Sequence, residues 1–223
     1  MSEPATRIRV VLFDLDGTLA DTAPDLANAL NHTLRGHGRE PLPLEAIRPH
    51  VSHGGMVLIR FGFGIGADHP QFEIYRRDLL DFYLANIARE TRLFDGMERV
   101  LDTLEGEGIA WGVVTNKPAW LTDPLMRALG LDRRAACIVS GDTLRYSKPR
   151  PEPILHGCAL AGASPGECLY VGDAERDIEA GRRAGTATLV ALFGYLGEGD
   201  EPARWGGDGL LNHPAELLDW LGL

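Results

Sequence analysis

Residues whose side chains or main-chain N–H groups could do chemistry follow four apolar runs in this chain of 223 residues. They are Asp14, Asp16, Gly17 and Thr18 after the first run, Thr115 and Asn116 after the second, Lys148 after the third, and Asp173 and Asp177 after the fourth. Asp14 and Asp16 stand one residue apart, and two such charges repel by about 4 kcal/mol at a separation of about 4 Å and an effective dielectric constant of about 20. A bound cation would largely remove this repulsion.

The types of these residues predict which cation and which kind of substrate the site binds. The carboxylates of Asp14, Asp16 and Asp173 are hard oxygen ligands, which suit Mg²⁺ shared with a substrate phosphate. Lys148 supplies a point charge for the phosphate, and main-chain N–H groups near Gly17 and Asn116 can surround phosphoryl oxygens. This set predicts phosphoryl transfer on a small phosphate ester, with Mg²⁺ as cofactor.

The elements that must position these residues alternate between strands and helices. Apolar, β-branched runs predict strands at 8–13, 110–114, 136–139, 168–171 and 186–192, and helical spacing predicts helices at 97–107, 119–129, 152–161 and 178–184. This alternation is typical of an α/β fold with a Rossmann-like parallel sheet. Ligands of such sheets bind beyond the carboxyl ends of the strands, where the polar residues stand.

Residues 22–90 interrupt this alternation. Helical patterns at 24–35 and 72–88 flank a segment rich in Gly, His and Pro, and we find no strand pattern between them. About 70 residues are too many for a connecting loop. We therefore expect a helical insertion over 22–90 that lies above the site, and a core built from 1–21 and 91–223.

The composition limits the partners. The chain has 32 acidic and 22 basic residues and a net charge of −10, which disfavours nucleic acid and anionic membranes. Three cysteines without CxxC spacing favour a reducing compartment. The first residues, MSEPATRIR, contain no apolar stretch of signal-peptide length. We expect a cytoplasmic protein, as a monomer or a small homo-oligomer.

The four stretches DLDGT, VVTN, SKP and GDAERD resemble, in order and spacing, the four motifs of the haloacid dehalogenase (HAD) superfamily. The resemblance implies a Mg²⁺-dependent phosphatase that works through an aspartyl-phosphate. It implies that Asp14 is the nucleophile, that Asp16 is the general acid and then the base, and that Lys148 orients Asp14 and the phosphate. It also implies that Thr115 and Asn116 bind phosphoryl oxygens, that Asp14, Asp173 and the Asp16 carbonyl hold Mg²⁺, and that Asp177 orients its neighbours.

The insertion matches the cap of one group in this superfamily. Within that group the chain is similar to phosphoglycolate phosphatases and, in WGVVTNKP and the tail EPARWGGDGLLNHPAEL, to N-acetylmuramic acid 6-phosphate phosphatases. Either phosphate ester is therefore the expected substrate. In the insertion, His53, Gly54 and Gly55 are candidate substrate contacts, with a polar hinge as the alternative. Lys117 is assigned no role.

Other functions fit parts of the pattern. A calcium loop starting at Asp14 needs Gly at its sixth position, where Leu19 stands. A phosphonate hydrolase needs a lysine in the cap, and residues 22–90 contain none. Two alternatives stay open: a sugar phosphomutase that uses the same two aspartates, and a non-catalytic regulator that binds a phosphorylated metabolite.

Overall fold

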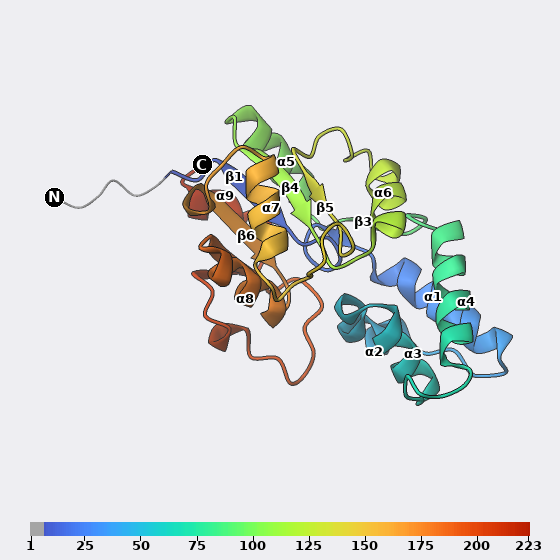
Figure 1. The fold of residues 1–223 in the computed structure, drawn as a ribbon. Coiled ribbons are helices and arrows are strands. Elements are labelled where there is room, and N and C mark those ends of the chain that lie inside the picture. Colours follow the sequence, from blue (N-terminus) through green and yellow to red (C-terminus); the bar gives the residue numbers. More distant parts are fainter. Residues whose placement is uncertain (1–6) are drawn as a thin grey trace.

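The computed structural model describes residues 7–223; residues 1–6, the start of the expected core segment, lie outside the described part. Its main sheet has six strands in the order β5-β4-β1-β6-β7-β8, and every neighbouring pair is parallel. The strands are β1 (Val10–Phe13), β4 (Ala110–Val114), β5 (Ile138–Val139), β6 (Cys168–Gly172), β7 (Ala187–Ala191) and β8 (Gly209–Leu211). The predicted α/β class with a parallel sheet is confirmed (Figure 1).

Both faces of this sheet are covered by helices. Val11 and Phe13 of β1 belong to a cluster with α5 (Met97–Gly106), α6 (Ala119–Ala128) and α9 (Glu216–Leu221). Val10 and Leu12 belong to the opposite cluster, with α7 (Glu152–Leu160) and α8 (Glu175–Ala184). Because successive side chains of a strand point to opposite faces, an unbroken apolar run is what a doubly covered strand requires.

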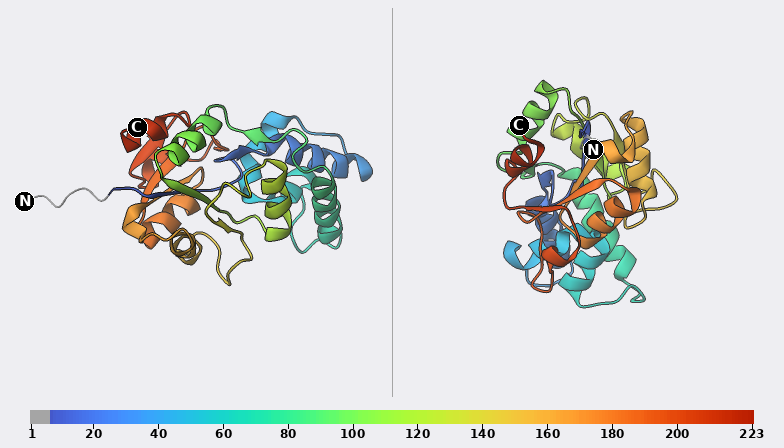
Figure 2. Two further views of the ribbon diagram at one scale, coloured as in Figure 1. Left: turned by 90° about the horizontal axis from the view of Figure 1, so that it is seen from above. Right: turned by 90° about the vertical axis from the view of Figure 1, so that its left-hand side faces the viewer.

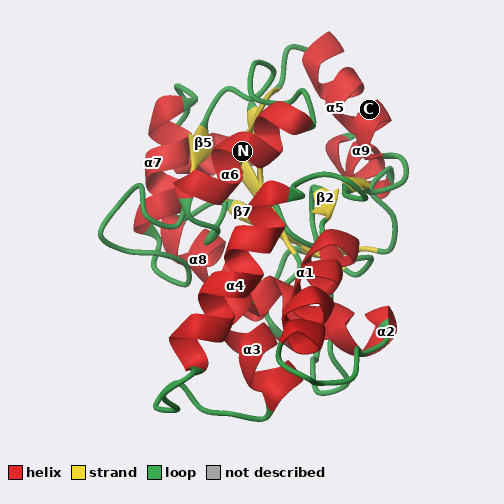
Figure 3. Cartoon of the chain, turned by 90° about the vertical axis from the view of Figure 1, so that its right-hand side faces the viewer, coloured by secondary structure: helices red, strands yellow, loops and turns green. Residues whose placement is uncertain are grey.

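The insertion is entirely helical between its two linkers. It contains α1 (Ala23–Gly36), α2 (Leu44–Ile47), the 3-10 helix η1 (Arg48–His53), α3 (Gly55–Phe63) and α4 (Phe72–Ala85). These helices enclose a hydrophobic cluster in which Leu26, Leu30 and Leu34 of α1 are buried, and which Leu121 of α6 and Tyr195 also join. The insertion lies at one end of the molecule, and the C-terminus lies at the other (Figures 2 and 3).

The two linkers of the insertion pair with each other. β2 (Ala20–Asp21) runs antiparallel to β3 (Arg92–Leu93). Beside this pair, the buried carboxylate of Asp25 accepts hydrogen bonds from the N–H of Glu90 (3.0 Å), the N–H of Thr91 (2.9 Å) and the Thr91 hydroxyl (2.7 Å). The chain therefore leaves and re-enters the core at one point, next to the end of β1.

Several short elements were not predicted: β2, β3, β8, α9 and the 3-10 helices η2 (Pro165–Glu167) and η3 (Pro202–Arg204). Elements of two to six residues carry too few positions to show a period. Helix α8 also begins at Glu175, three residues before the predicted start, because the acidic first turn interrupts the apolar pattern. Across residues 7–223, none of the helices combines the length and the apolar character needed to span a membrane.

Candidate active site

Lys148 lies at the centre of the site, and its side chain is fully buried. Its Nζ is 3.0 Å from Asp14 Oδ1 and 2.7 Å from Asp177 Oδ1. The same ammonium donates to the carbonyl of Val114 (3.0 Å) and to the hydroxyl of Tyr170 (2.7 Å). These partners come from the ends of β1 and β4, from β6 and from α8, so the lysine ties together four elements at one edge of the sheet.

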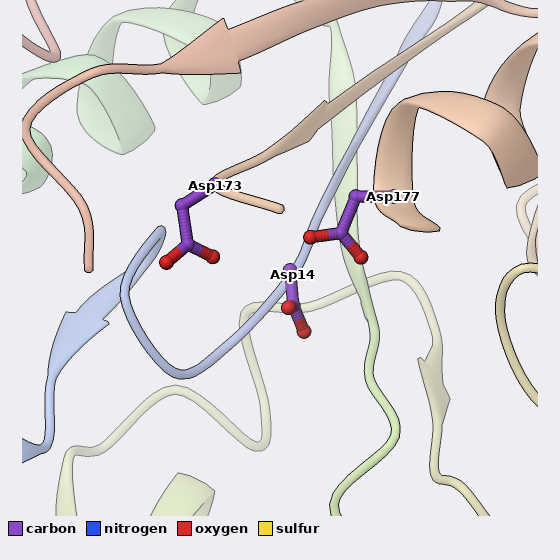
Figure 4. Close-up of side chains that lie close together, drawn as sticks. All are labelled: Asp14, Asp173 and Asp177. Atoms are coloured by element: carbon purple, nitrogen blue, oxygen red, sulfur yellow. The ribbon is translucent and has the colours of Figure 1, made fainter. Parts of the chain in front are cut away.

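Three buried carboxylates meet at this edge. Asp14 follows β1, Asp173 follows β6 and Asp177 lies in the first turn of α8, and one ligand atom of each lies within 4.8 Å of the others (Figure 4). Burial raises the pKa of Asp173 to about 7, and the charges of Asp177 and Asp14 add to this shift. Burial also raises the pKa of Asp177. The ammonium of Lys148 cannot neutralise three carboxylates, so this set of hard oxygen ligands fits a divalent cation.

The turn after β1 brings the backbone against this cluster. Gly17 has φ of +85°, and a Cβ atom there would lie 2.2 Å from Asp173 Oδ2. The next residue, Thr18, donates a hydrogen bond of 3.2 Å from its hydroxyl to Asp173 Oδ1. Only glycine combines the left-handed conformation with the space available here.

The side chain of Asp16 points elsewhere. Its Oδ1 accepts hydrogen bonds from the hydroxyl of Thr22 (2.7 Å) and from Nζ of Lys117 (2.9 Å), and its Oδ2 lies 3.2 Å from the same Nζ. Lys117, for which no role was predicted from the sequence, is therefore a direct neighbour of Asp16. The available signal was the scarcity of lysine, since the chain has only Lys117 and Lys148.

Thr115 and Asn116 follow β4 and lie in the same wall of the site as Lys117. The hydroxyl of Thr115 is buried and accepts a hydrogen bond of 3.2 Å from the N–H of Lys117. The amide of Asn116 makes two hydrogen bonds of 3.0 Å with the main chain of Lys148, one in each direction. The Asn116 side chain thus holds the loop that carries Lys148.

A cavity of about 640 Å³ opens between these residues and the insertion. Asp14, Asp16 and Thr115 line it from the sheet, and His53, Gly54 and Gly55 line it from the insertion. These predicted site residues of both parts therefore face one space, whereas Gly17, Lys148 and Asp173 are not among the residues that line it. The apolar part of its wall includes Val51, Met56, Val57, Leu80 and Trp120.

Ser52 and Arg176 join the insertion to the acidic cluster, and a role for Arg176 was not predicted from the sequence. The Ser52 hydroxyl donates a hydrogen bond of 2.8 Å to Asp173 Oδ2. Arg176 donates to the Ser52 carbonyl (2.6 Å) and lies 3.2 Å from Nδ1 of His53. Burial and the charge of Arg176 lower the pKa of His53. Nothing in the sequence separates Arg176 from other arginines of a first helical turn.

Comparison with known proteins agrees with this geometry. Residues 11–191 match the haloacid dehalogenase-like hydrolases, and the chain belongs to this family. It is 41% identical over 215 residues to an N-acetylmuramic acid 6-phosphate phosphatase of Pseudomonas aeruginosa, covering 96% of this chain and 95% of the relative. It is also 41% identical over 206 residues to a phosphoglycolate phosphatase of Xylella fastidiosa, covering 92% and 90%.

The fold is shared with solved structures. A crystal structure of a predicted phosphoglycolate phosphatase from Haemophilus somnus superimposes with a TM-score of 0.85, at 27% sequence identity, over 97% of this chain and 99% of that one. The family resemblance predicted from the four motifs is confirmed.

Proposed function

We propose that this protein is a Mg²⁺-dependent phosphatase that hydrolyses the phosphate monoester of a small metabolite through an aspartyl-phosphate. The observation that carries the proposal is the fully buried Lys148, which contacts Asp177 and also Asp14, a residue that lines the cavity. Asp173 lies beside Asp14 and Asp177 in the same acidic cluster. The names of the relatives and the general chemistry of the family support it.

Two steps complete the reaction. In the first, a carboxylate oxygen of Asp14 attacks phosphorus, the ester P–O bond breaks, and Asp16 gives a proton to the leaving oxygen. In the second, Asp16 takes a proton from water as the water oxygen attacks phosphorus, and the bond between phosphorus and Asp14 breaks. Inorganic phosphate leaves, and both aspartates return to their starting states. Thr115, Asn116 and Gly17 would contact phosphoryl oxygens.

Asp14, Asp173 and the main-chain carbonyl of Asp16 would hold the Mg²⁺, and Asp177 would orient Lys148. The bound ion would neutralise charge on the transferring phosphoryl group. Lys148 supplies the second positive charge, and its contacts with Val114 and Tyr170 keep its ammonium in place.

The cavity favours the larger of the two expected substrates. Its volume of about 640 Å³ is far more than a two-carbon phosphorylated acid fills. The apolar side chains of Met56, Leu80 and Trp120 suit the methyl groups and ring face of an N-acetylated sugar. Arg76 and Arg176 also line the cavity and can face a substrate carboxylate. We therefore propose N-acetylmuramic acid 6-phosphate as the substrate, ahead of 2-phosphoglycolate.

We also propose that residues 22–90 are a cap over a core of residues 1–21 and 91–223, and that His53, Gly54 and Gly55 contact the non-phosphate end of the substrate. The pairing of the two linkers beside Asp25 supports this division, and so does the hydrophobic cluster that the insertion helices enclose, most of whose residues belong to the insertion. We further propose that the protein acts in the cytoplasm, which its three cysteines without CxxC spacing favour.

The test is phosphate release from N-acetylmuramic acid 6-phosphate, 2-phosphoglycolate, glucose 6-phosphate and a nucleoside monophosphate, each with and without Mg²⁺. We expect kcat/KM for the first ester to exceed the others by at least about 100-fold, which corresponds to about 2.7 kcal/mol of differential binding in the transition state. Release that needs no divalent ion contradicts the Mg²⁺ proposal. No release from any ester in the presence of Mg²⁺ contradicts the phosphatase proposal.

A further inference from the structure

Lys117 and Asp16 form an ion pair that is almost completely removed from solvent. The side chain of Lys117 is 6% exposed and that of Asp16 is 15% exposed. Surface ion pairs contribute little to stability or to function, but a pair inside a protein holds both partners more firmly, because fewer water molecules compete for them. The pair also faces the cavity, since both residues line it.

A residue of the insertion covers this pair. Nζ of Lys117 lies 4.7 Å from the ring centroid of Tyr83, a buried residue of α4. The Tyr83 hydroxyl finds no hydrogen-bond partner among residues 7–223, and burial raises its pKa to about 12. A cation above an aromatic face is attracted by the ring. Tyr83 therefore holds the ammonium from one side and keeps water away from it.

The two carboxylate oxygens of Asp16 differ in the number of their contacts. Oδ1 accepts from both Thr22 and Lys117, whereas Oδ2 has only the longer contact of 3.2 Å with Lys117 within the described chain. The orientation of the carboxylate is therefore determined by Thr22 on one side and Lys117 on the other. Oδ2 remains the oxygen that can exchange a proton with a group in the cavity.

We propose that Lys117 is a positioning residue for Asp16, and that Tyr83 shields the pair beneath the insertion. The inference rests on the proposed function, in which Asp16 protonates the leaving oxygen and later deprotonates water. Loss of the ammonium frees the Asp16 carboxylate to turn about its side-chain bonds, and both proton transfers slow. Substrate binding stays nearly unchanged, because Lys117 acts through Asp16.

The variant Lys117→Met, compared with Lys117→Arg, tests this inference. With an alkyl phosphate ester, we expect Lys117→Met to lower kcat about 100-fold, at the low end of the contribution of general acid–base groups, with KM within about twofold. With p-nitrophenyl phosphate, whose leaving group needs no acid, only the second step slows. The variant then releases about one equivalent of nitrophenolate per site in a burst. Lys117→Arg keeps the charge, and we expect its kcat to be at least about tenfold higher than that of Lys117→Met.

A double variant that combines Lys117→Met with Asp16→Asn tests whether Lys117 affects kcat through Asp16. If Lys117 acts through Asp16, adding Lys117→Met to Asp16→Asn causes less than a twofold further loss of kcat. If Lys117→Met alone does not fold, the comparison of the double variant with Asp16→Asn still tests the role of Lys117, because the double variant leaves no unpaired charge. A circular dichroism melt of each variant shows whether it is folded.

Three results would overturn the inference. An increase in KM at unchanged kcat would make Lys117 a substrate-binding residue. Multiplicative losses in the double variant would show that Lys117 acts independently of Asp16. A wild-type protein that releases no phosphate from any ester defeats the proposed function and this inference together, whereas an active wild type with multiplicative losses defeats only the positioning role.

Discussion

The hydroxyl of Ser52 donates a hydrogen bond of 2.8 Å to Oδ2 of Asp173, which joins the insertion directly to the acidic cluster of the sheet. Ser52 stands in η1 and Asp173 follows β6, so the two residues are 121 positions apart in the chain. The same oxygen of Asp173 accepts the N–H of Tyr195 at 3.0 Å. The insertion and the acidic cluster are therefore linked through one carboxylate.

Replacement of Ser52 by alanine should destabilise the metal-free protein. The substitution removes a hydrogen bond to a buried carboxylate, and such bonds contribute about 1.5–3 kcal/mol. Urea unfolding in EDTA measures the loss, with Ser147→Ala as a control, because Ser147 is exposed. Equal stability of the two variants would show that the contact between Ser52 and Asp173 contributes nothing.

The stability of the metal-free protein should depend on pH through Asp173. Its folded pKa, about 7, lies above its ordinary value of 3.8, so the folded state binds a proton that the unfolded state has released. The contribution of this group to the free energy of unfolding is complete below pH 4 and is lost as the pH rises to about 7.

Urea unfolding in EDTA at several pH values measures this effect as a difference between wild type and Asp173→Asn. The wild type should lose stability relative to the variant between pH 4 and pH 7, and Glu175→Gln, an exposed neighbour, should follow the wild type. Mg²⁺ at about 100 times its dissociation constant should stabilise the wild type by about 2.7 kcal/mol and leave Asp173→Asn nearly unchanged. If the free energies of unfolding of wild type and Asp173→Asn changed with pH in the same way, Asp173 would not be the group responsible for the pH dependence.

Gly17→Ala should lower the stability and the activity of the protein far more than Gly38→Ala. Both glycines have positive φ, +85° and +72°, but a Cβ at Gly38 meets no atom within 4 Å, whereas at Gly17 it would overlap Asp173. The conformational cost alone is about 1–2 kcal/mol. We expect Gly38→Ala to show only this cost in urea unfolding, and Gly17→Ala to lose more stability and most of its phosphatase activity. Equal effects at the two positions would show that the close approach to Asp173 is unimportant.

Trp120 should select for the sugar part of the substrate. Its side chain lines the cavity and is 45% exposed. We expect Trp120→Ala to raise KM for N-acetylmuramic acid 6-phosphate about tenfold, as loss of about 1.4 kcal/mol of apolar contact implies, with little change for p-nitrophenyl phosphate. Trp220→Ala is the control, since Trp220 is similarly exposed on α9. An equal rise in KM for both esters would argue against a contact with the sugar.

The sequence predicted the sheet and the convergence of the motifs because both depend on local patterns. The apolar run before Asp14 and the glycine after Asp16 can be recognised from the residues themselves. The pairing of Lys117 with Asp16 cannot be predicted in this way, because the two residues are 101 positions apart and their contact depends on how the loop after β4 turns toward the first strand. A role for Arg176 was not predicted for the same reason, since its contacts with Ser52 and His53 depend on where the insertion lies.

Length explains the elements that were missed. Strands β2 and β3 have two residues each, and they form because Asp25 brings residues 90 and 91 back beside α1. Strand β8 contains Gly209 and only two apolar residues, and it is an edge strand of the sheet that pairs with β7 alone among the described strands. Such elements are stabilised by tertiary contacts, and intrinsic propensity contributes little to them.

The most direct test of the account is the role of Asp14, measured as phosphate release from N-acetylmuramic acid 6-phosphate in the presence of Mg²⁺. Asp14→Asn keeps the size of the side chain but removes the nucleophile, and kcat should fall by at least about 10³-fold. Acid-quenched wild-type enzyme should in addition carry phosphate bound to the protein, and Asp14→Asn should carry none. A variant that releases phosphate at the wild-type rate would contradict the proposed mechanism.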